Sequence, residues 1–342
     1  MRVLLTGHDG YIGAVMTPLL IEAGHEVVGL DSGLFDGCDF GPYASGVKLL
    51  RRELRDVEAK ELAGFDAVIH LAAISNDPLG NLNPDCTYDI NHRASVRLAE
   101  EARRAGVPRY LYSSSCSVYG AASPDEVLDE SASFSPVTPY GKSKVLVEED
   151  VAKLADRSFS PTFMRNATVY GISPRLRGDL VVNNLVGWAH TTGRVLIKSD
   201  GTPWRPLVHV EDVCRAFLAV LAAPRERVHN EAFNVGRNGE NYRISDVADL
   251  VKQALPGSVI EYAEGAGPDP RCYRVDFSKI AQALPDFRPT WSVAAGVVEL
   301  RDAFRSIGLT QADLEGDRYL RIRHIGRLQS EGRLDASLRW VR

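Results

Sequence analysis

Residues 4–14, LLTGHDGYIGA, decide the fold of the N-terminal half of this chain. Three glycines, Gly7, Gly10 and Gly13, stand three residues apart between an apolar run and a stretch of helical periodicity at 15–24. This pattern predicts a strand, a tight turn and a helix. Glycines at such a turn allow backbone N–H groups to approach a diphosphate, and the helix N-terminus adds positive potential there.

Short β-rich runs alternate with helical patterns as the chain continues from this turn. Strands are predicted at 2–7, 25–31, 66–73, 109–115, 162–171 and 232–236, and helices at 15–24, 94–106 and 139–155. Strands that alternate with helices through right-handed crossovers form a doubly wound parallel sheet. We therefore expect an α/β fold of the Rossmann type.

Glycine and proline become more frequent after Tyr170, which indicates a second, smaller α/β lobe. The first lobe is assigned residues 1–170, and 209–253 return to it. The second lobe is assigned 171–208 and 254–308.

Residues 309–342 form a C-terminal tail in which apolar residues recur every third position. The four that define this pattern are Tyr319, Ile322, Ile325 and Leu328. Such a pattern predicts a helix that packs against the body of the protein or against another subunit.

Composition excludes several classes of protein. The 342 residues are 44% hydrophobic and 25% charged, which is typical of globular proteins, and the net charge of −5 gives no reason to expect nucleic acid or an anionic membrane as partner. We recognise neither a secretory signal nor an apolar stretch long enough to span a bilayer, so a cytoplasmic location is expected. The cysteines are scattered and form no CxxC pair, which argues against a disulfide framework and against a metal site. They are Cys38, Cys86, Cys116, Cys214 and Cys272.

An acidic residue, Asp31, ends the second predicted strand, 18 residues after Gly13. A carboxylate at this place can accept both hydroxyls of an adenosine ribose and would repel a 2′-phosphate, so NAD is predicted rather than NADP. A nucleotide-triphosphatase loop is excluded, because GKS at 141–143 would require glycine at position 136, where the chain has Pro136. His8 and Asp9, inside the first turn, are interpreted as turn formers.

A second motif, YGKSK, places Tyr140 and Lys144 four residues apart on one face of a helix. A free tyrosine has a pKa near 10 and is a poor base at neutral pH. A neighbouring ammonium group and the positive nicotinamide ring favour the phenolate. Upstream, YLYSSSCSVYG at 110–120 brings hydroxyl groups to the end of a strand, and Ser115 is the one predicted to share a substrate hydroxyl proton with Tyr140.

Taken together, the glycine turn, Asp31, HLAA at 70–73, the serine run and YxxxK resemble an extended short-chain dehydrogenase/reductase. Within that group the chain is similar to the NAD-dependent nucleotide-sugar epimerase/dehydratase family over roughly residues 1–300. The resemblance implies NAD in the first lobe, a nucleoside-diphosphate sugar in the second, and a homodimer formed through the helix that carries the YxxxK motif and the helix before it.

The resemblance also assigns roles to individual residues. Catalysis falls on Ser115, Tyr140 and Lys144. Cofactor contacts fall on Tyr140, Lys144, Gly7, Gly10, Tyr11, Ile12, Gly13, Asp31, Asp56, Val57, Leu71, Ala72, Ala73, Asn91 and Ser113. Substrate contacts fall on Ser115, Thr168, Arg177, Asn183, Arg205 and Arg271.

Among the substrate residues, Arg205 and Arg271 match the family's diphosphate-binding arginines, whose planar fork suits phosphate oxygens. Thr168 replaces an asparagine found in many members, a variant similar to UDP-glucuronate 4-epimerases. In those proteins a downstream arginine lies near the uronate, and Arg177 is the candidate here. Asn76 and Asp77 could touch the sugar, but turn formation is the favoured interpretation of both.

The residues after the catalytic serine select among the reactions of the family. The family's 4,6-dehydratases carry Asp-Glu there, whereas this chain has Cys116 and Ser117. We therefore predict 4-epimerisation, which needs no further acid or base. The alternatives are a dehydratase or a C3/C5 epimerase that uses Cys116 as acid/base, a 4-ketoreductase, and a non-catalytic NAD-sensing protein.

Overall fold

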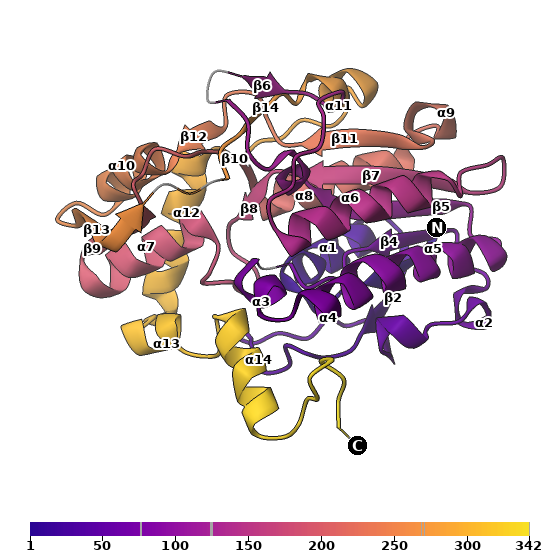
Figure 1. Ribbon diagram of the computed structural model, residues 1–342, viewed down its shortest axis with the longest axis horizontal. Coiled ribbons are helices and arrows are strands. Elements are labelled where there is room, and N and C mark those ends of the chain that lie inside the picture. Colours follow the sequence, from indigo (N-terminus) through magenta and orange to yellow (C-terminus); the bar gives the residue numbers. More distant parts are fainter. Residues whose placement is uncertain (76, 124–125, 268, 270, 342) are drawn as a thin grey trace.

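The computed structural model describes residues 1–75, 77–123, 126–267, 269 and 271–341. A seven-stranded, all-parallel sheet lies at its centre, with helices on both faces (Figure 1). Along the sheet the strands are β11 (Glu231–Val235), β7 (Ser160–Asn166), β5 (Arg109–Ser115), β4 (Ala67–His70), β1 (Arg2–Thr6), β2 (Glu26–Asp31) and β3 (Lys48–Arg51). This confirms the predicted doubly wound α/β fold.

The central strands are apolar on both faces because helices cover both. Val3 and Leu5 of β1 pack in one core with helices α1 (Tyr11–Glu22) and α8 (Val210–Ala222). Leu4 points the other way, into a second core with α5 (Ala94–Arg104) and α6 (Pro139–Ala152). Alternate residues of one strand thus supply two separate cores.

The predicted strand 162–171 is divided in the structure. β7 ends at Asn166 in the main sheet, and β8 (Thr168–Tyr170) pairs in a different sheet with β10 (Trp204–His209), which in turn pairs with β12 (Asn241–Arg243). The apolar pattern continues across the division, so periodicity alone could not show that the chain changes sheets.

The second lobe is built around this small sheet and a two-stranded one. Its further elements are β9 (Arg194–Ser199), β13 (Val259–Gly267), α7 (Val181–Thr192), α10 (Ile244–Ala254) and α12 (Val293–Ile307). The apolar face of α10 packs in the core of this lobe, although its sequence was assigned to the first lobe. Conversely, Val275, Phe277 and Ile280 pack with the main sheet.

The remaining elements are short. They are η1 (Leu54–Asp56), α2 (Ala59–Leu62), α3 (Asp77–Leu82), α4 (Pro84–Tyr88), η2 (Asp89–Arg93), η3 (Cys116–Tyr119), β6 (Val127–Leu128), α9 (Arg225–Val228), β14 (Arg274–Val275), α11 (Ser278–Ala283), α13 (Gln311–Glu315) and α14 (Arg321–Ser330). In the part of the chain that the structure describes, no helix has both the length and the apolar character needed to cross a bilayer.

The C-terminal tail packs on the body of its own chain, near α3 and α4 (Figure 1). Ile325 and Leu328 of α14 share a small core with Ile74, Leu79 and Cys86. The predicted three-residue stripe is only partly correct, because the helix begins after Leu320. Tyr319 packs in the core of the second lobe, and Ile322 is exposed.

Candidate active site

A cavity of about 1080 Å³ lies at the carboxyl ends of the main-sheet strands and extends into the second lobe. Ligands of open α/β sheets bind at this edge. The predicted residues that line it are Gly7, Gly10, Tyr11, Ile12, Gly13, Asp31, Leu71, Ala72, Ala73, Ser113, Ser115, Tyr140, Lys144, Thr168, Arg177, Arg205 and Arg271. Five predicted residues lie elsewhere and are treated below.

The glycine turn is required by close backbone contacts. Gly7 has φ +71°, and a Cβ there would lie 2.8 Å from the backbone nitrogen of Ala72. A Cβ on Gly13 would overlap the carbonyl oxygen of Gly7, because α1 starts directly against the turn. The turn and the first residues of α1 therefore present bare backbone to the cavity, as a diphosphate requires.

Asp31 lies at the end of β2, on the cavity wall beside this turn. Its Oδ1 accepts a hydrogen bond from Gly33 N at 2.8 Å, and its Oδ2 accepts one from Asp9 N at 3.3 Å. These bonds orient the carboxylate, while burial raises its pKa above the ordinary value of an aspartate. The carboxylate of Asp31 thus lies where the sequence predicts an acid that binds a ribose.

The catalytic candidates come together from β5 and α6. Thr138 caps α6, accepting a hydrogen bond from Gly141 N at 3.1 Å, and Pro139 occupies the first turn. Lys144, one turn into the helix, donates from Nζ to the Ser113 carbonyl oxygen at 2.6 Å, and its Nζ lies 5.5 Å from the Tyr140 ring centre.

Burial and neighbouring groups act in opposite directions on this pair. Burial raises the pKa of Tyr140 to about 12, and a hydrogen bond with Ser115 opposes that rise. Burial lowers the pKa of Lys144 to about 7, opposed by the charge of Glu148. A tyrosine in these surroundings becomes a base only where positive charge lies close to its oxygen. The charge of Arg177 lowers the pKa of Tyr140, and Lys144 is a second cationic side chain beside the ring.

Cys116 does not belong to the cavity. Its thiol is fully buried, and Sγ donates to the carbonyl oxygen of Arg165 at 3.1 Å, within the core beneath the sheet end. Burial raises the pKa of this thiol far above that of a free cysteine. The position therefore argues against Cys116 as acid/base, and Ser117 lines the cavity in its place.

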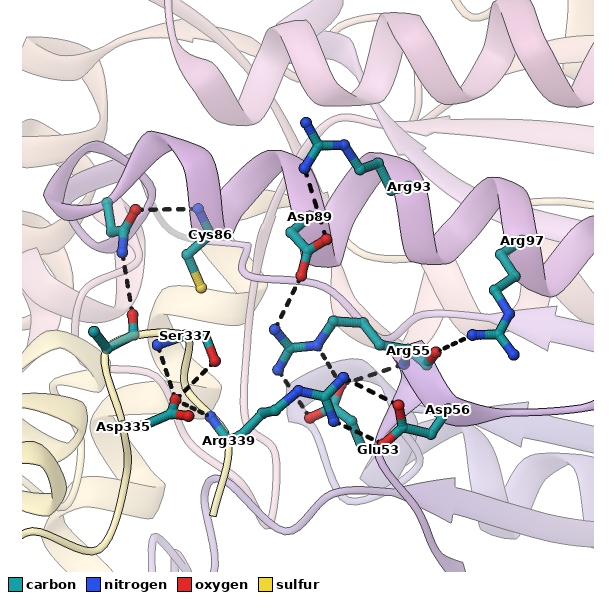
Figure 2. Close-up of polar contacts among 12 residues, drawn as sticks. Glu53, Arg55, Asp56, Cys86, Asp89, Arg93, Arg97, Asp335, Ser337 and Arg339 are labelled. Carbon is teal, nitrogen blue, oxygen red and sulfur yellow. Dashed lines mark hydrogen bonds and ion pairs between the residues drawn. The ribbon is translucent and has the colours of Figure 1, made fainter. Parts of the chain in front are cut away.

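Asp56 and Val57 also lie away from the cavity. The side chain of Asp56 forms an ion pair with Arg339 of the tail at 2.7 Å (Figure 2), and Val57 is buried in the core. Glu53 and Leu54 line the cavity instead, because the chain turns through η1 directly after β3. The predicted pair thus stands three residues too far along the chain.

Two predicted asparagines stabilise backbone rather than line the cavity. Asn91 Oδ1 accepts from Ile74 N at 2.7 Å and its Nδ2 donates to Ile74 O at 2.9 Å, which fixes the chain just after β4. Asn183 Oδ1 accepts from Gly171 N at 3.0 Å, and its Nδ2 donates to Arg177 O at 3.0 Å. Both side chains are completely buried.

The two diphosphate candidates lie side by side in the second lobe, held by acids. Asp269 accepts hydrogen bonds from Arg205 Nη2 at 2.9 Å and from Arg271 Nη2 at 2.7 Å. Arg271 also pairs with Asp77 at 2.5 Å, so Asp77 lies on the cavity wall as a partner of an arginine. Asn76 falls outside the described residues.

Arg177 is already paired. Its Nε and Nη2 donate to Asp179 at 3.1 and 2.6 Å, and its Nη1 donates to Ser75 Oγ at 3.1 Å. Thr168, at the start of β8, lines the same cavity.

Sequence reasoning missed several lining residues. Asn166, at the carboxyl end of β7, donates from Nδ2 to Ser113 Oγ at 3.0 Å. Asn166 lies in the middle of the predicted strand 162–171, so the rule that ligands bind at strand ends could not single it out. Asp269 and five residues of the tail carried no signal in the sequence either. The tail residues are Leu320, Arg321, Ile322, Ile325 and Leu338.

Comparisons with known proteins agree with this geometry. Residues 3–236 match the model of the NAD dependent epimerase/dehydratase family, and the chain belongs to that family. The UDP-glucose 4-epimerase of Streptomyces lividans is 31% identical over 295 residues, covering 79% of this chain and 86% of that protein.

Two solved structures illustrate the likeness in three dimensions. MoeE5 in complex with UDP-glucose and NAD has a TM-score of 0.77 at 28% identity, covering 90% of this chain and 100% of that one. The NDP-hexosamine 5,6-dehydratase TunA has a TM-score of 0.79 at 24% identity, covering 89% of this chain and 98% of that one, and so shares the fold.

The family is NAD-dependent, and the residues of this cavity fit NAD. The glycine turn provides a cradle that any Cβ would fill, and Asp31 provides the oriented carboxylate for a ribose. NAD is the cofactor of this protein.

Proposed function

We propose that the protein is a 4-epimerase of a nucleoside-diphosphate hexose, acting through a 4-keto sugar. The observation that carries the proposal is the meeting of Ser115, Tyr140 and Lys144 at the cavity. The residue after the serine, Cys116, is buried in the core and so adds no further acid or base. NAD bound in the cavity supplies a hydride acceptor and donor.

Each catalytic residue has a distinct task in this proposal. Tyr140 removes the proton of the C4 hydroxyl group and later returns it, and Ser115 shares that proton by hydrogen bonding. Lys144, fixed by the Ser113 carbonyl, places positive charge near the tyrosine ring. Inversion then requires only that the ketone turn over, which needs no additional side chain.

The carboxylates at the sugar end support epimerisation over elimination. Elimination requires a free acid and base at C5 and C6 of the sugar. Here Asp77 and Asp269 are bound by Arg271, and Asp179 is bound by Arg177. A carboxylate held by a guanidinium is a weaker base.

Three arginines of the cavity suggest which chemical groups the substrate contains. Arg205 and Arg271 offer guanidinium forks for a diphosphate, which would take over part of the role of Asp269. Arg177, neutralised by Asp179, has little charge left for a uronate. A neutral hexose is therefore the proposed sugar, with UDP as the nucleotide by likeness to the Streptomyces relative.

The proposed reaction is tested by its products in deuterium oxide. In 4-epimerisation the C4 hydrogen leaves and returns as hydride, so no carbon-bound hydrogen meets solvent. UDP-glucose incubated with the enzyme should give the C4 epimer without deuterium on any ring carbon, measured by NMR and mass spectrometry. Deuterium at C3 or C5, loss of water, stoichiometric consumption of reduced cofactor, or binding of NAD without turnover would each contradict the proposal.

Asp31 is expected to set the preference for NAD over NADP. Asp31→Ala should weaken NAD binding and strengthen NADP binding, because it removes a ribose acceptor and a repulsive charge. A repulsion of about 1.4 kcal/mol between the carboxylate and the 2′-phosphate corresponds to a tenfold change in the dissociation constant. The ratio of NADP to NAD dissociation constants, measured by titration, should therefore fall at least about tenfold. Asp36→Ala, an exposed acid paired with Arg51, is the control and should leave the preference unchanged. Equal affinities in the wild type would contradict the assignment.

The homodimer and the cytoplasmic location stay predictions. The dimer would be formed by α5 and α6 of each subunit. Sedimentation of the purified protein measures its oligomeric state, and a monomeric mass would contradict the predicted dimer.

A further inference from the structure

The C-terminal tail forms part of the cavity wall, although it lies outside the two lobes that the motifs define. Leu320, Arg321, Ile322, Ile325 and Leu338 all line the cavity that contains the glycine turn and Asp31. We define residues 320–341 as the strap and ask what holds it there.

One set of anchors lies on the loop that follows Asp31. Trp340 Nε1 donates to Ser32 O at 2.8 Å. His324 Nε2 lies 2.9 Å from Leu34 O, which can only accept, so Nε2 carries a proton. His324 Nδ1 is then the acceptor for the thiol of Cys38 at 3.2 Å, and burial raises the pKa of that thiol, which keeps it protonated.

A second set of anchors lies beside Glu53, another cavity residue (Figure 2). Arg339 binds both carboxylate oxygens of Asp56, at 2.7 and 3.0 Å. Asp335 accepts from the backbone nitrogens of Ser337 and Arg339, at 2.8 and 2.9 Å, which fixes the turn that presents the Arg339 side chain.

The opposite edge of the strap is held by α3 and α4. Asn83 Nδ2 donates to Ala336 O at 3.1 Å. Leu334 and Leu338 pack in a small core with Leu79 and Cys86. The strap thus bridges two edges of one cavity, the loop after β2 on one side and α3–α4 on the other.

We propose that the strap closes the cavity over the adenosine half of NAD and slows release of the cofactor. This rests on the proposed NAD site. The strap's polar contacts with Ser32, Leu34 and Asp56 lie beside Asp31 and Glu53, on the wall assigned to NAD. Its other polar contacts with the two lobes, among the described residues, are with Cys38, Asn83 and the carbonyl oxygen of Arg175, and none is with Arg205 or Arg271. The contacts beside Asp31 and Glu53 are the reason for assigning the strap to the cofactor.

Charge within the strap favours an anionic occupant of the cavity. Arg321 is 4% exposed, and its guanidinium stacks 3.8 Å from the ring centre of Phe35. Its Nη2 donates to the carbonyl oxygen of Arg175 at 3.4 Å, whereas its Nη1 has no acceptor among the described residues. A buried cation without an anionic partner is unfavourable, and a diphosphate in the same cavity would offset it. By linkage, NAD should then stabilise the strap as much as the strap stabilises bound NAD.

Retention also suits an enzyme that returns the hydride to the sugar from which it came. Loss of the reduced cofactor between the two transfers would leave the 4-keto sugar without a hydride donor. A strap that makes cofactor release slow compared with turnover prevents this abortive path.

The test compares a strap variant that loses contacts with the cavity wall with one that loses contacts elsewhere. Arg339→Gln/Trp340→Phe removes the bonds to Asp56 and Ser32 and leaves the apolar core intact. Arg327→Gln is the matched control, because Arg327 is similarly exposed but pairs with Asp317 and Glu331, outside the cavity wall. Each protein is loaded with radiolabelled NAD, and release is followed after a chase with unlabelled NAD.

The double variant should release NAD several-fold faster than the wild type and the control, with unchanged affinity for UDP. In addition, amides of α14 in the wild type should exchange hydrogen more slowly when NAD is bound, a measurement that needs no variant. Equal release rates, a loss of UDP affinity instead, or α14 exchange unaffected by NAD would overturn the proposal. Failure of the wild type to bind NAD at all would overturn the NAD site itself.

Discussion

Tyr140→Phe is expected to lower kcat by about 10²- to 10⁴-fold, the range lost with a general acid–base group. The substitution removes one oxygen and keeps the ring, which packs near Lys144 at the start of α6. NAD binding and the midpoint of thermal unfolding should stay close to those of the wild type. Steady-state turnover of UDP-glucose, calorimetric unfolding and NAD titration together check the three expectations.

Tyr112 offers a matched control. It is a buried tyrosine whose ring centre lies 4.6 Å from the same Lys144 Nζ, and its hydroxyl has no hydrogen-bond partner in the described part of the chain. Tyr112→Phe should therefore retain turnover. If the Tyr140 variant keeps wild-type rates, Tyr140 is not the base.

The second large effect concerns stability. Glu148→Ala should lower the free energy of unfolding by about 3–5 kcal/mol, because it leaves the Arg165 guanidinium buried without its counter-charge. Arg165 Nη2 lies 2.7 Å from Glu148 Oε2, and both side chains are 6% exposed. Ser114 Oγ also donates to Glu148 Oε1 at 2.5 Å.

This ion pair joins the elements that carry the catalytic groups. Glu148 lies one turn after Lys144 on α6, Ser114 precedes Ser115 on β5, and Arg165 lies on the adjacent strand β7. Urea unfolding measures the loss. Glu149→Ala, an exposed neighbour, should change stability by no more than about 0.5 kcal/mol. A loss for Glu148→Ala as small as that of the control would contradict the account.

The sequence by itself determined the parts of the protein that rest on local rules. The glycine turn, Asp31 and YxxxK could be placed because each depends on the period of a strand or helix and on backbone geometry within a few residues. Parallel strands bring their carboxyl ends to one edge, so residues far apart in sequence, such as Ser115 and Gly7, could be predicted to share a cavity.

Other features depended on tertiary structure because no local rule encodes them. The direction of the Cys116 side chain, the division of the strand 162–171 and the exchange of Asp56–Val57 for Glu53–Leu54 depend on which sheet a residue joins and on where a strand ends. The position of the strap depended on tertiary structure most. Its helical pattern predicts an apolar face, but only packing against Leu79 and Cys86, and the ion pair between Arg339 and Asp56, bring that face to the cofactor cavity. Long-range packing of this kind depends on the shape of the finished body, which periodicity along the chain does not contain.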